Sequence, residues 1–123
     1  MRITGKLVPG LGEGKFFLSM EHYKNEIKKK LKFVPFPGTL NIQSEAPFDP
    51  KGLKPIRIEG YTKDNKTFGG ATCYKAEIEE ENCAIIVPDL TRHEKNIIEV
   101  ISKIHLRVKL KLNDNDFVTL DTK

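Results

Sequence analysis

The sequence predicts a mainly β protein, a small barrel of short strands with one clear helix packed on it. Short apolar or alternating segments recur along the 123 residues, and turn-forming residues separate them. One segment has a clear helical period, which argues against the regular strand–helix alternation of a doubly wound parallel sheet. The length fits one domain with its own core, so we expect residues 1–123 to form a single domain.

The first third of the chain contains two predicted strands and the helix. Residues 2–8 alternate as a strand, and the aromatic-rich residues 15–20 read as a second strand. The period then changes to that of a helix. Apolar side chains follow at Met20, Tyr23, Ile27 and Leu31, with lysines on the opposite face. The helix must end before Pro35.

The rest of the chain is predicted to be mostly strand. The expected strands are residues 38–42, 56–62, 67–78, 83–88, 96–102 and 117–120. The segments KDNK, EEEN and NDND read as turns between them. Residues 103–110 fit either a short helix or a continuing strand. The sum is about seven short strands with one or two helices.

The composition limits the cellular location and the ligands that we expect for the protein. No apolar run is long enough to span a membrane, and the first ten residues lack the apolar core of a signal peptide. Cys73 and Cys83 lack metal-binding spacing, so we expect free thiols in a reducing, cytoplasmic compartment. The net charge of +4 suits an anionic ligand, and equally a weak nucleic-acid surface.

The stretch GLGEGKFFLS, residues 10–19, has glycines at three alternate positions. It does not match a dinucleotide fingerprint, because Lys15 occupies the sixth position and a strand is expected to follow. It does not match a phosphate-binding P-loop either, because Pro9 replaces the first glycine. Alternating glycines can still turn successive N–H groups toward an anion, with Lys15 adding charge. The alternative is a glycine-rich turn without a ligand.

A second pattern is the pair Thr39 and Asn41. Residues two apart on a strand point to the same face, so these two oxygens are expected to converge while Leu40 faces the core. Two neutral oxygens bind Mg²⁺ poorly unless phosphate and water complete its shell. The pair therefore fits half of a metal–nucleotide site, or alternatively a polar strand edge.

Five segments taken together resemble the archaeal CTP-dependent riboflavin kinases. In chain order these are GKLVPGLGEGKFFLS, PFPGTLNI, TFGGATCY, TRHEKNIIEVIS and LRVKLKLNDND, and they cover nearly the whole chain. The resemblance implies a six-stranded cradle-loop β-barrel. It also implies transfer of the γ-phosphate of CTP to the 5′-hydroxyl of riboflavin, which gives FMN and CDP, with one Mg²⁺ ion.

The resemblance also implies roles for particular residues. The phosphate loop would be Gly10, Leu11, Gly12, Glu13, Gly14, Lys15 and Phe16. The cytidine end would lie against Ile104, His105, Leu106 and Arg107. Thr39 and Asn41 would hold Mg²⁺, and Thr91 and Glu99 would contact the flavin. A carboxylate could accept the proton of the ribityl hydroxyl, and Glu99 and Glu13 both remain candidates.

A different class of function stays open from the residues alone. Small barrels also serve as nucleic-acid-binding or regulatory modules without catalysis, and a pI near 9.0 is compatible with that. Such a module needs clustered basic residues, whereas this chain has four arginines and its densest basic run is Lys28–Lys30 with Lys32. The resemblance implies riboflavin and CTP as ligands, and neither nucleic acid nor a membrane is expected as a partner. The sequence leaves the oligomeric state open.

Overall fold

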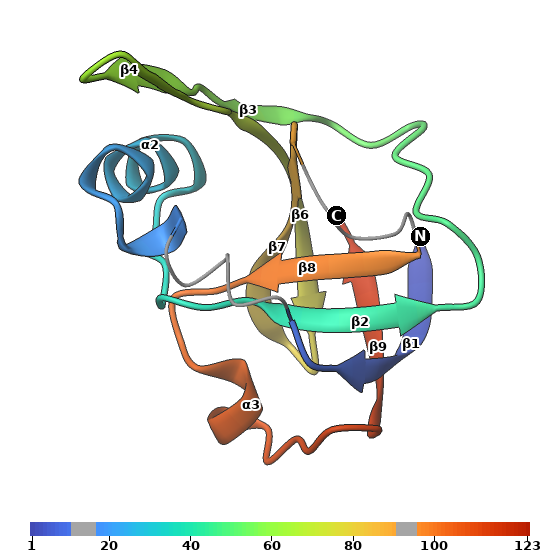
Figure 1. Cartoon of the computed structure of the whole chain (residues 1–123). Coiled ribbons are helices and arrows are strands. Elements are labelled where there is room, and N and C mark those ends of the chain that lie inside the picture. The colour runs from blue at the N-terminus through green and yellow to red at the C-terminus, as the bar shows by residue number, and fades with distance from the viewer. Residues whose placement is uncertain (11–16, 91–95) are drawn as a thin grey trace.

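The computed structural model describes residues 1–10, 17–90 and 96–123. Within these residues, six strands close into an antiparallel barrel in the order β6-β7-β8-β2-β1-β9 (Figure 1). The barrel strands are β1 (Arg2–Val8), β2 (Leu40–Ser44), β6 (Ala71–Ile78), β7 (Glu81–Pro88), β8 (Ile97–Ile101) and β9 (Phe117–Thr122). Pairing of β6 with β9 closes the barrel, and the two chain ends meet where Thr122 donates to the Met1 carbonyl at 2.9 Å.

The remaining elements lie around the barrel. Strand β3 (Ile56–Ile58) pairs with β6 at one edge, and β4 (Tyr61–Lys63) and β5 (Lys66–Phe68) form a separate hairpin. Helix α2 (Glu21–Leu31) lies beside β3, and the short helix α3 (Leu106–Lys109) lies at the opposite end of the barrel (Figure 1). No helix in the described residues is long and apolar enough to cross a bilayer.

Alternation along the strands produces two cores. On β7, Cys83 and Ile85 point into the barrel, while Ala84 and Ile86 point outward. The outward residues pack with the apolar face of α2, whose Tyr23 and Ile27 are fully buried. Strands buried on both faces explain why segments such as 83–88 lack a polar alternation.

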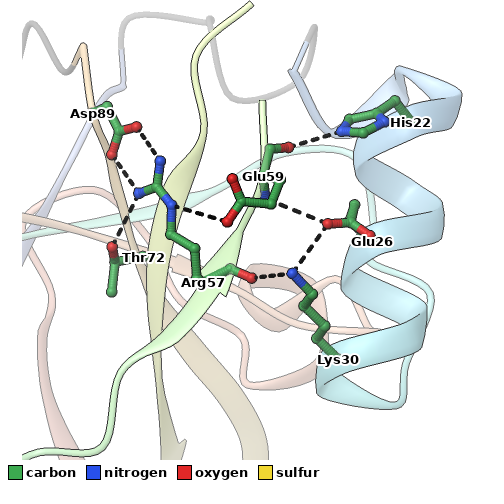
Figure 2. A network of polar contacts seen from close by, with 7 residues as sticks. All are labelled: His22, Glu26, Lys30, Arg57, Glu59, Thr72 and Asp89. Carbon is green, nitrogen blue, oxygen red and sulfur yellow. Dashed lines mark hydrogen bonds and ion pairs between the residues drawn. The ribbon is translucent and has the colours of Figure 1, made fainter. Parts of the chain in front are cut away.

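Helix α2 also covers the open edge of β3 (Figure 2). His22 Nε2 donates to the Glu59 carbonyl at 2.8 Å, and the Glu59 N–H donates to Glu26 Oε1 at 3.3 Å. One turn further along, Lys30 Nζ donates to the Arg57 carbonyl at 2.6 Å. These side chains satisfy backbone groups that an edge strand would otherwise offer to another chain.

Several predicted elements are confirmed. The first strand has the predicted bounds, and the helix ends at Leu31, before Pro35. The KDNK turn places Asp64 and Asn65 at positive φ, as a tight hairpin requires. The ambiguous segment 103–110 contains a helix, α3, and the strand predicted at 38–42 begins at Leu40 and runs to Ser44.

Three predicted strands are wrong in part. Residues 17–19, predicted as strand, are helical, because Leu18 and Phe17 pack against the α2 core and Phe17 stacks on Tyr23. The strands predicted at 56–62 and 67–78 are each broken in two. At the breaks the backbones approach so closely that a β-carbon on Gly60 would stand 2.2 Å from the Phe68 carbonyl oxygen. Only glycine permits that approach.

Candidate active site

The candidate site centres on Asn41 of β2, between β1 and β8. The strand register pairs Asn41 with Val8 on β1 and with Glu99 on β8. Directly paired residues of antiparallel strands share a face, so Asn41 and Glu99 lie side by side. Their neighbours Ile42 and Ile98 point into the barrel core, which places Asn41 and Glu99 on the outer face.

The Asn41 side chain has a buried oxygen with an unused acceptor. The residue is 4% exposed, and its Oδ1 has no hydrogen-bond partner within the described residues. Its Nδ2 lies 3.3 Å from both the carbonyl and the hydroxyl oxygen of Thr39. Thr39 and Asn41 thus lie together as expected, but the Asn41 amide nitrogen rather than its oxygen faces the Thr39 hydroxyl, and Leu40 between them is in the barrel core as predicted.

The start of the glycine stretch lies against the same side chain. Strand β1 ends at Val8, opposite Asn41, and the chain then reaches Gly10. A β-carbon at Gly10 would stand 2.4 Å from Asn41 Nδ2, so the backbone touches the amide there. The other residues expected in the phosphate loop, Leu11 to Phe16, lie outside the described residues. Thr91, expected to contact flavin, also lies outside them.

A pocket of about 430 Å³ begins at Thr39 and extends toward α3. This volume is in the range of small-molecule sites. It is lined by two segments, Phe36–Leu40 and Ile104–Arg107, together with Val100 and Ser102. The predicted nucleotide segment, Ile104–Arg107, therefore shares a pocket with the predicted metal ligand Thr39.

Arg107 and His105 are both held in place at this pocket. Arg107 Nη1 forms an ion pair with Asp114 at 2.9 Å, which fixes the guanidinium from the side of the NDND turn. The His105 ring stacks on Phe36, with centroids 4.4 Å apart and planes 13° from parallel. The pocket residues that the sequence reasoning missed include Phe36 and Ser102. The segment PFPGTLNI contains Phe36, but an aromatic residue in it reads as core by default.

The donor set of the site is oxygen-rich and lacks the softer metal ligands. No group of three or more His, Cys, Asp or Glu residues gathers anywhere in residues 1–10, 17–90 and 96–123. An amide oxygen, a hydroxyl and a nearby carboxylate are ligands of hard cations such as Mg²⁺ rather than of zinc.

Comparison with known proteins matches this site to a family. The model of the CTP-dependent riboflavin kinase family, described as a domain of unknown function, DUF120, covers residues 7–122. The chain belongs to this family. The matched range includes Gly10, Thr39, Asn41, Glu99 and the segment Ile104–Arg107.

Three riboflavin kinases illustrate the similarity. The protein of Methanocella arvoryzae is 45% identical over 94% of this chain, and that of Pyrobaculum aerophilum is 40% identical over 98%. The protein of Saccharolobus solfataricus is 41% identical over 98% of this chain. The chain spans 54% and 60% of the first two relatives' lengths and 73% of the third. These relatives support the predicted family.

Proposed function

We propose that this chain is a riboflavin kinase that transfers the γ-phosphate of CTP to the 5′-hydroxyl of riboflavin, giving FMN and CDP. One observation carries the proposal. Asn41, whose buried Oδ1 has no hydrogen-bond partner within the described residues, lies beside Thr39 and Gly10, and a pocket of ligand size begins at Thr39. Membership of the family supplies the reaction and the name of the donor.

The Asn41 and Thr39 oxygens fit a Mg²⁺ ion that shares its shell with phosphate oxygens and water. A buried amide oxygen without a hydrogen bond is costly unless a ligand satisfies it. Mg²⁺ demands oxygen ligands and keeps several from water or phosphate, which suits two neutral protein donors. When bound, the ion would neutralise part of the phosphate charge.

The pocket beyond Thr39 is proposed to hold the cytidine. Its lining includes the stacked rings of Phe36 and His105 and the segment Ile104–Arg107, to which His105 belongs. A cytosine edge can be read by one N–H donor and one carbonyl acceptor of a backbone. The choice of CTP over ATP rests on the family name, and the pocket geometry by itself does not separate the two.

The flavin is proposed to approach from the Glu99 side of Asn41. The strand register puts this buried carboxylate next to the proposed metal ligand, which suits contact with a hydroxyl near the phosphate. Glu99 and Glu13 both remain candidates for accepting the ribityl proton. Thr91 is proposed as the second flavin contact.

Catalysis in this scheme depends on alignment and on neutralising charge. The pocket orients the nucleotide so that its γ-phosphate reaches the Asn41 end. The N–H groups of the glycine stretch, with Lys15, stabilise negative charge on the transferring group. Arg107, oriented by Asp114, adds a fixed positive charge in the same pocket.

A turnover assay tests the function. Purified protein is mixed with riboflavin and Mg²⁺, and CTP, ATP, GTP and UTP are supplied separately while FMN is followed by chromatography. The proposal expects FMN with CTP and far less with the other three. Folded protein that makes no FMN with any nucleotide would refute it, and equal rates with all four would refute the choice of donor.

The metal assignment has a readout independent of turnover. Mn²⁺ replaces Mg²⁺, and its binding in the presence of CDP is followed by electron paramagnetic resonance. Asn41→Ala is expected to weaken Mn²⁺ binding at least tenfold, since it removes a ligand. Gln43→Ala, an exposed amide on the same strand, is the matched control and should bind Mn²⁺ as the unchanged chain does. Equal binding by both variants would exclude Asn41 as a ligand.

A further inference from the structure

Ser102 is a buried polar residue for which neither the family nor the proposed reaction provides a role. It follows directly after β8 and is 3% exposed. Its hydroxyl donates to the Asn82 carbonyl at 3.1 Å and accepts a hydrogen bond from the Ile104 N–H at 3.3 Å. Its own carbonyl accepts the Phe36 N–H at 2.7 Å. Ser102 thus bonds to three segments, of which those at Phe36 and Asn82 are distant in the sequence and the one at Ile104 follows directly.

Two of these three segments line the pocket. Phe36 belongs to the wall that continues to Thr39, and Ile104 begins the wall that continues to Arg107. The third segment, at Asn82, is the start of β7 and therefore part of the rigid barrel. Through Ser102, both walls are tied to each other and to the barrel frame.

The stacked rings of Phe36 and His105 follow from this arrangement. The Phe36 N–H bonds to the Ser102 carbonyl, and His105 follows Ile104, whose N–H bonds to the Ser102 hydroxyl. Their centroids are 4.4 Å apart with nearly parallel planes. A planar ring pair at a pocket wall presents a flat, apolar face, which favours a planar heterocycle such as a nucleobase.

We infer that Ser102 is a positioning residue that holds the two pocket-lining segments, at Phe36 and at Ile104, in place relative to each other and so sets the affinity for the base of the nucleotide. The inference rests on the proposed function. The Ser102 hydroxyl does not itself need to touch the nucleotide. Without the hydroxyl, the Ile104 N–H and the Asn82 carbonyl each lose a partner in a poorly hydrated region, and the Ile104 wall is no longer fixed.

The test is Ser102→Ala, with Ser44→Ala as the matched control. Ser44 is also buried, at 8% exposure, and its hydroxyl donates to the Ala46 carbonyl at 2.5 Å. Ser44 does not line the nucleotide pocket. Ser102→Ala is expected to raise the KM for CTP and the Kd for CDP about tenfold, as loss of one to two well-placed hydrogen bonds predicts. The kcat at saturating CTP and the KM for riboflavin should stay within about twofold.

The control separates a positioning role from a general structural one. Both alanine variants are expected to unfold at a lower temperature, but only Ser102→Ala should weaken nucleotide binding. Ser102→Thr, which keeps the hydroxyl, should restore the affinity for CDP. If Ser102→Ala does not fold, Ser102→Cys keeps the side-chain volume while weakening both hydrogen bonds and takes its place.

The outcomes distinguish this inference from the proposed function. Unchanged CDP affinity in a folded Ser102→Ala variant refutes the role of Ser102, as does an equal loss in Ser44→Ala. If the unchanged chain binds CDP but makes no FMN, the proposed function fails and the comparison of CDP affinities still decides the role of Ser102. If the unchanged chain does not bind CDP at all, both fail.

Discussion

Gly10 packs directly against the side chain of Asn41, with no room for a β-carbon between the backbone and the amide. The nearest atom, Asn41 Nδ2, would lie 2.4 Å from such a carbon. The contact joins the start of the glycine stretch to the proposed Mg²⁺ ligand. A change at Gly10 must therefore move the amide or the backbone.

Gly10→Ala is expected to lower kcat/KM for FMN formation about a hundredfold, because displacing a metal ligand by about 1 Å has effects of that size. The melting temperature should change little, because the contact between Gly10 and Asn41 lies outside the barrel core. Steady-state kinetics and thermal unfolding of the same preparation test this. A variant with full activity would show that the contact with Asn41 plays no part in catalysis.

The Arg57–Asp89 ion pair makes a prediction about pH. Arg57 Nη1 donates to Asp89 Oδ1 at 2.7 Å, and Nη2 bonds the second carboxylate oxygen (Figure 2). The hydrogen bond from Arg57 lowers the pKa of Asp89 in the folded chain. A lowered carboxylate pKa stabilises the fold above the unfolded-state pKa of about 4, and this stability disappears as pH falls through the lower folded value.

Arg57→Ala should therefore lower the melting temperature at pH 7 and have a shrinking effect toward pH 2. The loss at pH 7 should be small, since both side chains are about two-fifths exposed and exposed pairs are screened. Arg57→Lys keeps the charge but not the two-pronged geometry, so its melting temperature should lie between those of the unchanged chain and of Arg57→Ala. An Arg57→Ala effect of the same size at both pH values would contradict this explanation.

The cover that α2 provides for β3 predicts a local change in hydrogen exchange. Glu26→Ala removes the acceptor of the Glu59 N–H, so exchange of that amide should accelerate about 2- to 10-fold, the range for one ordinary hydrogen bond. Glu21→Ala, in the first turn of the same helix, is the control and should leave the Glu59 amide unchanged. Nuclear magnetic resonance measures both. Equal rates in all three proteins would mean that Glu26 does not protect this edge.

The two cysteines are expected to be unreactive in the folded protein. Burial raises the pKa of Cys73 and of Cys83 to about 12 in each case. At pH 8 only about one thiol in 10⁴ would then be ionised, and the thiolate is the reactive form. A colorimetric disulfide reagent should thus react slowly with the native chain and rapidly with both thiols in denaturant. Fast reaction of the native chain would contradict the burial of these residues.

Local sequence patterns were sufficient to predict an element wherever the residues it interacts with are close in the sequence. The first strand, the α2 helix and the Asp64–Asn65 turn follow from alternation, helical period and turn chemistry, each of which acts over a few residues. The proximity of Thr39 to Asn41 also follows from their spacing of two residues, but the spacing does not decide which amide atom faces Thr39. The order of the motifs along the chain pointed to the family that the comparison then confirmed.

The elements that were predicted wrongly depend on contacts between residues that are distant in the sequence. Phe17–Ser19 read as strand by composition, but burial of Leu18 under α2 favours a helical turn. The strands around Gly60 break because another segment of backbone crosses there. Strand propensity acts over a few residues and therefore cannot predict such a crossing. Packing overrides the propensity there.

The small β-barrel and the family of this protein could both be predicted from the amino-acid sequence alone. Only the tertiary structure decided that Asn41 lies between Gly10 and Glu99, and that Ser102 joins both walls of the pocket. The physical reason is strand register. It is fixed by the barrel core as a whole, where a shift of one residue would turn every side chain to the opposite face.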